Sequence, residues 1–125
     1  MSTLAVGTIK SISSAAPVFQ NTSGVEKGQL AKAWVTYNAS IVIQDSFGIS
    51  SVSDTGDGDI TVNFSTNFSN DNYAVSTMAA SGDNCAFSCV DDSQAVGSCR
   101  VITRTSRTTG KTDFNLTHAN FFGDN

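Results

Sequence analysis

The chain has 125 residues, of which 14% are charged, and it carries a formal net charge of −4, ten glycines and a single proline. This length allows one domain with a modest core, and the many Ser, Thr, Asn and Gly residues are typical of a β-rich protein with frequent turns. The acidic balance argues against a nucleic-acid partner, which needs a basic protein face. No apolar run approaches the ~20 residues that cross a bilayer, and the N-terminus lacks the basic start and apolar stretch of a signal peptide. We therefore expect neither membrane insertion nor secretion by that route.

Residues 1–29 are the least regular part of the sequence and contain the only proline. Their apolar side chains are scattered among Ser, Thr, Gly and Asn, so this segment alone cannot bury enough apolar surface to offset the entropy cost of ordering it. We expect an extended N-terminal arm that is held by other copies of the chain or by a partner. The candidate attachment residues are Val6, Ile9, Val18 and Phe19.

Regular alternation begins near residue 30, so we place a β-rich domain at residues 30–125. Leu30–Tyr37 predicts a strand with Trp34 on one face and Val35 on the other, followed by a turn at residues 38–40 and a new strand from Ile41. The next stretch, FGISSVSDTGDGDITVNFSTNF, alternates apolar and polar residues after a run of Asp, Thr and Gly. That pattern predicts a β-hairpin with its turn in DTGDGD.

Further strands are expected after a polar connection at residues 67–72. Residues 73–80 predict one strand, while residues 81–98 fit either a long loop or an irregular hairpin. Residues 100–105 and 111–117 predict a final hairpin, with Phe114, Leu116 and His118 on one face. About seven short strands without a helical period predict an all-β fold, either a small antiparallel sandwich or an open barrel. An alternative is an incomplete sheet whose core closes only between chains.

The basic residues are unevenly placed along the sequence. No Lys or Arg lies between Lys32 and Arg100, whereas eight Asp residues do, and four of the seven basic residues then follow closely. The favoured interpretation is charge complementarity with the acidic middle of the chain, within or between subunits. The alternative is an anion-binding patch for phosphate or acidic sugar. The candidate ligand-binding residues are Arg100, Arg104, Arg107 and Lys111.

The residue types that bind metals or catalyse reactions do not form a recognisable motif. The Asp residues of DTGDGD lack the spacing of a calcium loop and fit a hairpin turn better. Cys85, Cys89 and Cys99 lack the paired spacing of a zinc site and would be free thiols or one disulfide, for example Cys85–Cys99, plus a free thiol. His118 has no nucleophile motif to accompany it. We expect no enzyme, no cofactor and no metal.

One resemblance adds to these patterns. The segments GQLAKAWVTYN, IVIQDSFGISSVSDTGDGDITVNF and NYAVSTMAA occur in this order, after the elements GTI and APVF. They resemble a module recurrent in tail-fibre-like and virion-surface proteins of marine tailed bacteriophages. The resemblance covers roughly residues 6–80 and rests on turns and core positions.

The resemblance implies a virion component, made in the host bacterial cytoplasm, that is all-β and homotrimeric. Its N-terminal arm would contact other virion proteins, and the part from residue 81 onward would face outward. Two roles follow from it: a tail-fibre-like protein that recognises a host-surface polysaccharide, or a capsid decoration, head-fibre or knob protein that binds the shell and no ligand. The match carries no catalytic residue.

Overall fold

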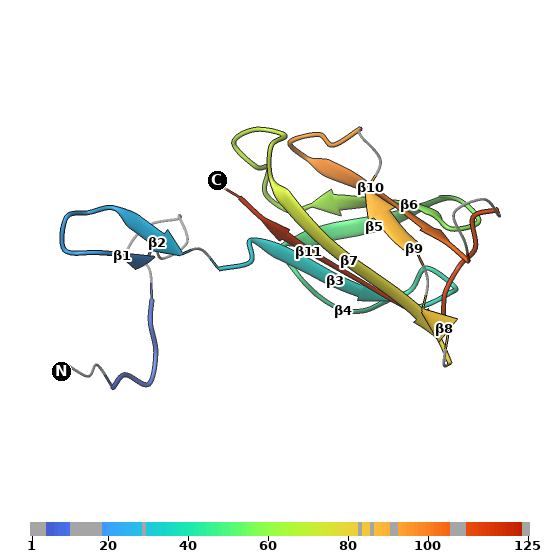
Figure 1. Cartoon of the computed structure of the whole chain (residues 1–125), viewed down its shortest axis with the longest axis horizontal. Helices are drawn as coiled ribbons and strands as arrows, with labels where there is room; N and C mark the ends of the chain where they lie inside the picture. The colour runs from blue at the N-terminus through green and yellow to red at the C-terminus, as the bar shows by residue number, and fades with distance from the viewer. Residues whose placement is uncertain are drawn as a thin grey trace. The chain divides into compact units, whose positions relative to one another are not determined.

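The computed structural model describes residues 5–10, 19–28, 30–82, 84–85, 87–90, 93–105 and 110–123. Within these residues the protein is all-β, with eleven strands and no helix (Figure 1). The described part of the chain accordingly has no helix that is long and apolar enough to span a membrane. The chain divides into two compact units, Met1–Leu30 and Ala31–Asn125, which are described separately.

The first unit contains a short antiparallel hairpin that the sequence patterns did not predict. Strand β1 (Phe19–Gln20) pairs with β2 (Glu26–Gly28). Asn21 fixes the turn between them, because its side-chain Oδ1 accepts hydrogen bonds from the backbone N–H groups of Ser23 (3.1 Å) and Val25 (2.9 Å). A polar residue therefore orders this segment locally, and the proposed attachment role of residues 1–29 stays a prediction.

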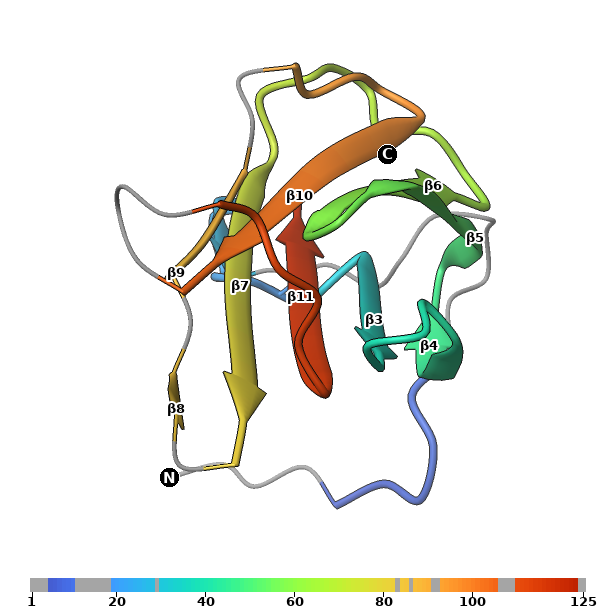
Figure 2. The same ribbon diagram turned by 90° about the vertical axis from the view of Figure 1, so that its right-hand side faces the viewer.

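The second unit consists of two antiparallel sheets. The five-stranded sheet has the order β4-β3-β11-β7-β8, and the four-stranded sheet has the order β5-β6-β10-β9. In Figure 2, β7, β11, β3 and β4 lie side by side, and β10 and β6 run across them as the second layer. The strands of the first sheet are β3 (Ala33–Tyr37), β4 (Ile43–Phe47), β7 (Ala74–Ser81), β8 (Asn84–Cys85) and β11 (Leu116–Phe122). Those of the second are β5 (Ile49–Gly56), β6 (Asp59–Phe64), β9 (Phe87–Val90) and β10 (Ser98–Arg104).

The hydrophobic core lies between these sheets. Successive side chains of a strand point to opposite faces, so every second residue of β3, β6, β10 and β11 is buried. The two inner faces therefore meet as in a β-sandwich. The central core residues are Val35, Tyr37, Ala119 and Phe121 from one sheet and Ile60, Val62, Phe64, Cys99 and Val101 from the other.

Aromatic side chains close one end of this core. Phe68 and Tyr73, from the β6–β7 connection, stack with ring centroids 4.3 Å apart, and Phe64 meets Phe68 and Phe121 edge to face at 4.9 Å. The Tyr73 hydroxyl donates to the backbone carbonyls of Ala95 (3.1 Å) and Ser98 (2.8 Å). The cluster thus connects both sheets to the turn that precedes β10.

Most of the locally encoded elements agree with the sequence predictions. The all-β class, the β5–β6 hairpin and the alternation of Val35 and Trp34 in β3 are confirmed. The predicted strand at residues 30–37 begins only at Ala33. Residues 81–98, left open between a loop and a hairpin, contain β8 and β9.

The predicted final hairpin is wrong. Residues 111–115 contribute only an isolated bridge between Lys111 and Arg104, and the strand begins at Leu116. This strand, β11, pairs with β3 and β7 in the five-stranded sheet, whereas β10 belongs to the other sheet. Phe114 is buried, but Leu116 is exposed on the outside, so the two do not share a face as expected. After the short antiparallel bridge between Lys111 and Arg104, the chain leaves β10 and enters the other sheet as β11.

Candidate functional site

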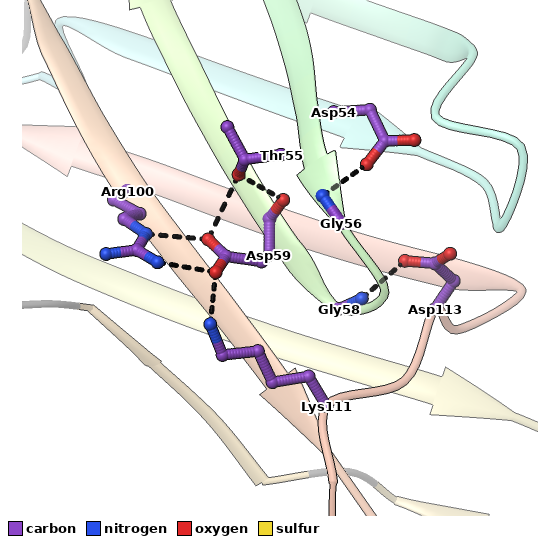
Figure 3. Close-up of polar contacts among 8 residues, drawn as sticks. All are labelled: Asp54, Thr55, Gly56, Gly58, Asp59, Arg100, Lys111 and Asp113. Atoms are coloured by element: carbon purple, nitrogen blue, oxygen red, sulfur yellow. Dashed lines mark hydrogen bonds and ion pairs between the residues drawn. The ribbon is translucent and has the colours of Figure 1, made fainter.

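A cluster of charged side chains surrounds Asp59 at the start of β6. Because Ile60 points into the core, the side chain of Asp59 lies on the opposite, outward side of the four-stranded sheet. Arg100 of β10 donates two hydrogen bonds to the Asp59 carboxylate, from Nε to Oδ1 at 2.6 Å and from Nη2 to Oδ2 at 2.5 Å. Lys111 also donates its Nζ to Oδ2, and Thr55 donates its hydroxyl to Oδ1 at 3.1 Å (Figure 3). Three side chains from three separate chain segments therefore donate four hydrogen bonds to one carboxylate.

The Asp59 carboxylate is strongly favoured in its charged form. Its side chain is 7% exposed, whereas those of Arg100 and Lys111 are 37% and 30% exposed. The hydrogen bonds from Arg100, followed by those from Lys111 and Thr55, hold the pKa of Asp59 well below its usual range, although burial acts in the opposite direction. The cluster is thus a partly buried ion pair whose cations keep access to water.

Hydrogen bonds from neighbouring segments support the β5–β6 turn. The Gly58 N–H donates to Asp113 Oδ1 at 2.8 Å (Figure 3). The Gly58 carbonyl accepts from the Thr103 N–H at 2.9 Å. Asp54 caps its own turn by accepting from the Gly56 N–H at 2.9 Å. The predicted hairpin is therefore confirmed, but its turn consists only of Asp57 and Gly58, since Asp54–Gly56 belong to β5 and Asp59, which forms the ion pair, belongs to β6.

The predicted basic patch is only partly assembled around this cluster. Arg100 and Lys111 come together on Asp59, which is the complementarity with the acidic middle that the sequence favoured. Arg104 lies further along β10, where its backbone is opposite Phe87 of β9. Arg107 lies outside the described residues. An anion-binding role for these four residues stays a prediction.

The outer face of the five-stranded sheet is the second notable surface. We use "the outer face" for the outward side chains of β4, β3, β11 and β7. Four large apolar side chains are well exposed here, from 38% for Phe122 to 61% for Met78. Polar groups lie between them, and the Thr36 hydroxyl and His118 Nδ1 are 2.9 Å apart in a hydrogen bond. The residues of the outer face are Trp34, Thr36, Asp45, Phe47, Ala74, Ser76, Met78, Ala80, Leu116, His118, Asn120 and Phe122.

Sequence reasoning did not find this surface, because it predicted the strands one by one and not which strands lie side by side. Trp34 and Phe47 are directly opposite each other on β3 and β4, and both point outward. The alternation of β3 had already separated Trp34 from the core residues Val35 and Tyr37, and that was the available signal. The register that brings Phe47 beside it is set by pairing between strands and is not visible in the sequence.

The candidate attachment residues are exposed wherever the structure describes them. Val6, Ile9 and Phe19 are 52%, 62% and 47% exposed within the first unit. Val18 lies outside the described residues. Exposed apolar side chains are available for contact with a partner, but their function as an attachment site stays a prediction.

Cys99 is a buried free thiol on the inner face of β10. Burial raises the pKa of this thiol to about 11, so it remains protonated and poorly nucleophilic at neutral pH. In the described part of the chain, no group of three or more His, Cys, Asp or Glu side chains is arranged to hold a metal ion. The geometry around Cys99 is that of a packed core residue.

Comparisons with known proteins gave no match, whether with protein-family models, with curated proteins or with solved structures.

Proposed function

We propose that this chain is a non-enzymatic structural protein of a tailed-phage virion, homotrimeric and tail-fibre-like, that contacts the host surface. The observation that carries the proposal is the outer face: an ordered sandwich presents a broad sheet surface with exposed Phe47, Met78 and Leu116. An exposed apolar surface of this kind suits contact with another protein chain, as in an assembled virion. The resemblance of residues 6–80 to phage surface modules supports the same class of protein.

Recognition of a host-surface polysaccharide forms part of this proposal. Arg104 is the described residue of the predicted basic patch whose side chain is not part of the Asp59 ion pair, and Arg107 is a candidate contact from the sequence alone. An acidic polysaccharide is the matching ligand, because guanidinium groups bind carboxylates with two parallel hydrogen bonds. We expect Arg104→Ala to weaken binding to such a polysaccharide, while Lys10→Ala in the first unit leaves it unchanged.

The second candidate function is capsid decoration without a ligand. It is favoured by the exposed apolar side chains of the first unit, Val6, Ile9 and Phe19, which could bind a shell as well as a fibre. Electron microscopy of phage particles with and without this chain distinguishes the two functions. Density at the tail-fibre tips supports host recognition, and density on the capsid lattice supports decoration. Absence of the chain from the particle would contradict both.

A further inference from the structure

We propose that the outer face of the five-stranded sheet binds the same face of a second copy of this chain. Phe47 and Met78 are 58% and 61% exposed there, and Leu116 and Phe122 are 40% and 38% exposed. Trp34 lies among them, directly opposite Phe47 on the neighbouring strand. A single copy thus leaves apolar side chains of β4, β3, β11 and β7 in water, and a second sheet would cover them.

Charge selects a second copy as the occupant. The chain has a net charge of −4, so two copies repel unless they meet where charge is low. Among the described residues of the outer face, Asp45 is the only Asp, Glu, Lys or Arg, and it lies on the edge strand β4. The other sheet, by contrast, carries Asp59, Arg100 and Arg104 on its outward side. The outer face can therefore meet its own copy with little electrostatic penalty.

Composition and size agree with an interface between copies. Aromatic residues and Met are enriched at the centre of protein interfaces, whereas Lys and Glu are depleted, as on this face. A large apolar side chain that is about half exposed offers roughly 100 Å² of apolar surface, so Phe47, Met78, Leu116 and Phe122 together offer about half of the roughly 800 Å² per partner of a standard interface. Polar neighbours such as Ser76 and Asn120 would complete the contact, as two sheets pack face to face in a sandwich.

A sugar fits the same face less well. The face carries aromatic rings, but its most exposed large apolar side chain, Met78, is flexible and offers no flat ring for stacking. Three of the polar groups are already committed, because Thr36 and His118 hydrogen-bond to each other and the Asp45 carboxylate accepts from the Ser46 N–H at 2.8 Å. These features favour a protein surface over a ligand that needs free hydrogen-bonding groups.

Sedimentation velocity over a concentration series tests the pairing on the full chain. We expect the wild type to associate and Met78→Glu to weaken association at least about tenfold, because each copy then places a charge in the centre of the contact. Leu116→Glu should act likewise. The matched control is Val96→Glu, since Val96 and Leu116 are both 40% exposed but Val96 lies in the turn before β10. Circular dichroism checks folding, and Met78→Ser, which adds no charge, replaces any variant that does not fold.

Pairing of one face with the same face of another copy closes at two copies, so it is a contact separate from the homotrimer of the proposed function, and the outcomes separate the two. Association that is lost in Met78→Glu and Leu116→Glu but kept in Val96→Glu supports the pairing. Association that none of these variants alters overturns the assigned surface, while the proposed virion protein stands. A wild type that stays monomeric up to about 100 μM overturns the pairing and the homotrimer, whereas the position on the particle is decided separately by microscopy. If the wild type is itself monomeric, loss of polysaccharide binding in Met78→Glu would assign the face to a sugar instead of a second copy.

Discussion

At the scale of single residues, Asp59 is the side chain on which most local structure depends. Its carboxylate contacts Arg100 and Lys111 from two other segments, and it is itself nearly inaccessible to water. Placing a carboxylate there costs desolvation, which the two cations offset. The three groups therefore stabilise the fold together, and removing the acid leaves two positive charges side by side.

We predict that Asp59→Asn lowers the free energy of unfolding by about 2 kcal/mol at neutral pH. Breaking a fully buried ion pair costs about 3–5 kcal/mol, but Arg100 and Lys111 can regain water, so the loss is smaller. Denaturation by urea measures it. Asp57→Asn is the control, because Asp57 is exposed in the same turn and Asn-Gly suits that turn as well as Asp-Gly. Equal losses of unfolding free energy in both variants would show that the substitutions act on the turn and not on the ion pair.

The same carboxylate gives a pH dependence whose sign is fixed. The pKa of Asp59 is depressed in the folded protein, chiefly by Arg100, while in the unfolded chain it is about 4. The contribution of this pair to stability is therefore complete above the unfolded pKa and is lost as the pH falls toward the folded one. We expect the stability difference between the wild type and Asp59→Asn to be largest near about pH 7 and to shrink by about pH 3. A difference that grows on acidification would contradict the assignment.

At the scale of elements, local patterns predicted what local contacts determine. The β5–β6 hairpin needs only alternation and a Gly-rich turn, both of which lie in one stretch of sequence. Strand β11 depends instead on β3 and β7, far away in the chain, so its register and bounds could not be read from residues 111–122 alone. The Asp59 cluster combines both cases. The sequence shows that Arg100 and Lys111 belong to a group of basic residues near the end of the chain. It does not show that Asp59 is their partner, because that depends on the register of β6 against β10.

Gly58 provides the test of this tightly packed turn. It has a φ of 58°, and an added Cβ would lie 2.4 Å from the Thr103 carbonyl oxygen and 2.3 Å from the Thr112 nitrogen. We predict that Gly58→Ala lowers the free energy of unfolding by roughly 3 kcal/mol, the sum of left-handed backbone strain and a backbone clash. Gly82→Ala is the matched control, because Gly82 has a φ of 59° but open space around it, and about 1 kcal/mol is expected there. Thermal and urea unfolding of both variants separate the clash from the strain, and similar losses would argue against the close contact.

At the scale of the whole molecule, the core belongs to one unit. Every residue of the hydrophobic cluster lies between Ala33 and Phe121, and the first unit contributes none of them. The first unit instead exposes apolar side chains such as Val6 and Ile9. We therefore expect the sandwich to provide the stability of the chain, and contact between the first unit and a partner stays a prediction.

Removal of residues 1–30 tests both points. We predict that the midpoint of thermal unfolding of the sandwich changes by less than about 2 °C in the truncated chain. The truncated chain retains every residue of the hydrophobic cluster and the hydrogen bond from the Lys32 N–H to the Phe121 carbonyl. Under the proposed function, the same truncation prevents incorporation into phage particles, since the exposed apolar side chains of the first unit are lost. Calorimetry measures the first effect and immunodetection on purified particles the second. A large fall in the midpoint would show that the first unit stabilises the sandwich. Normal incorporation would remove the attachment role and leave the sandwich itself as the part that binds the virion.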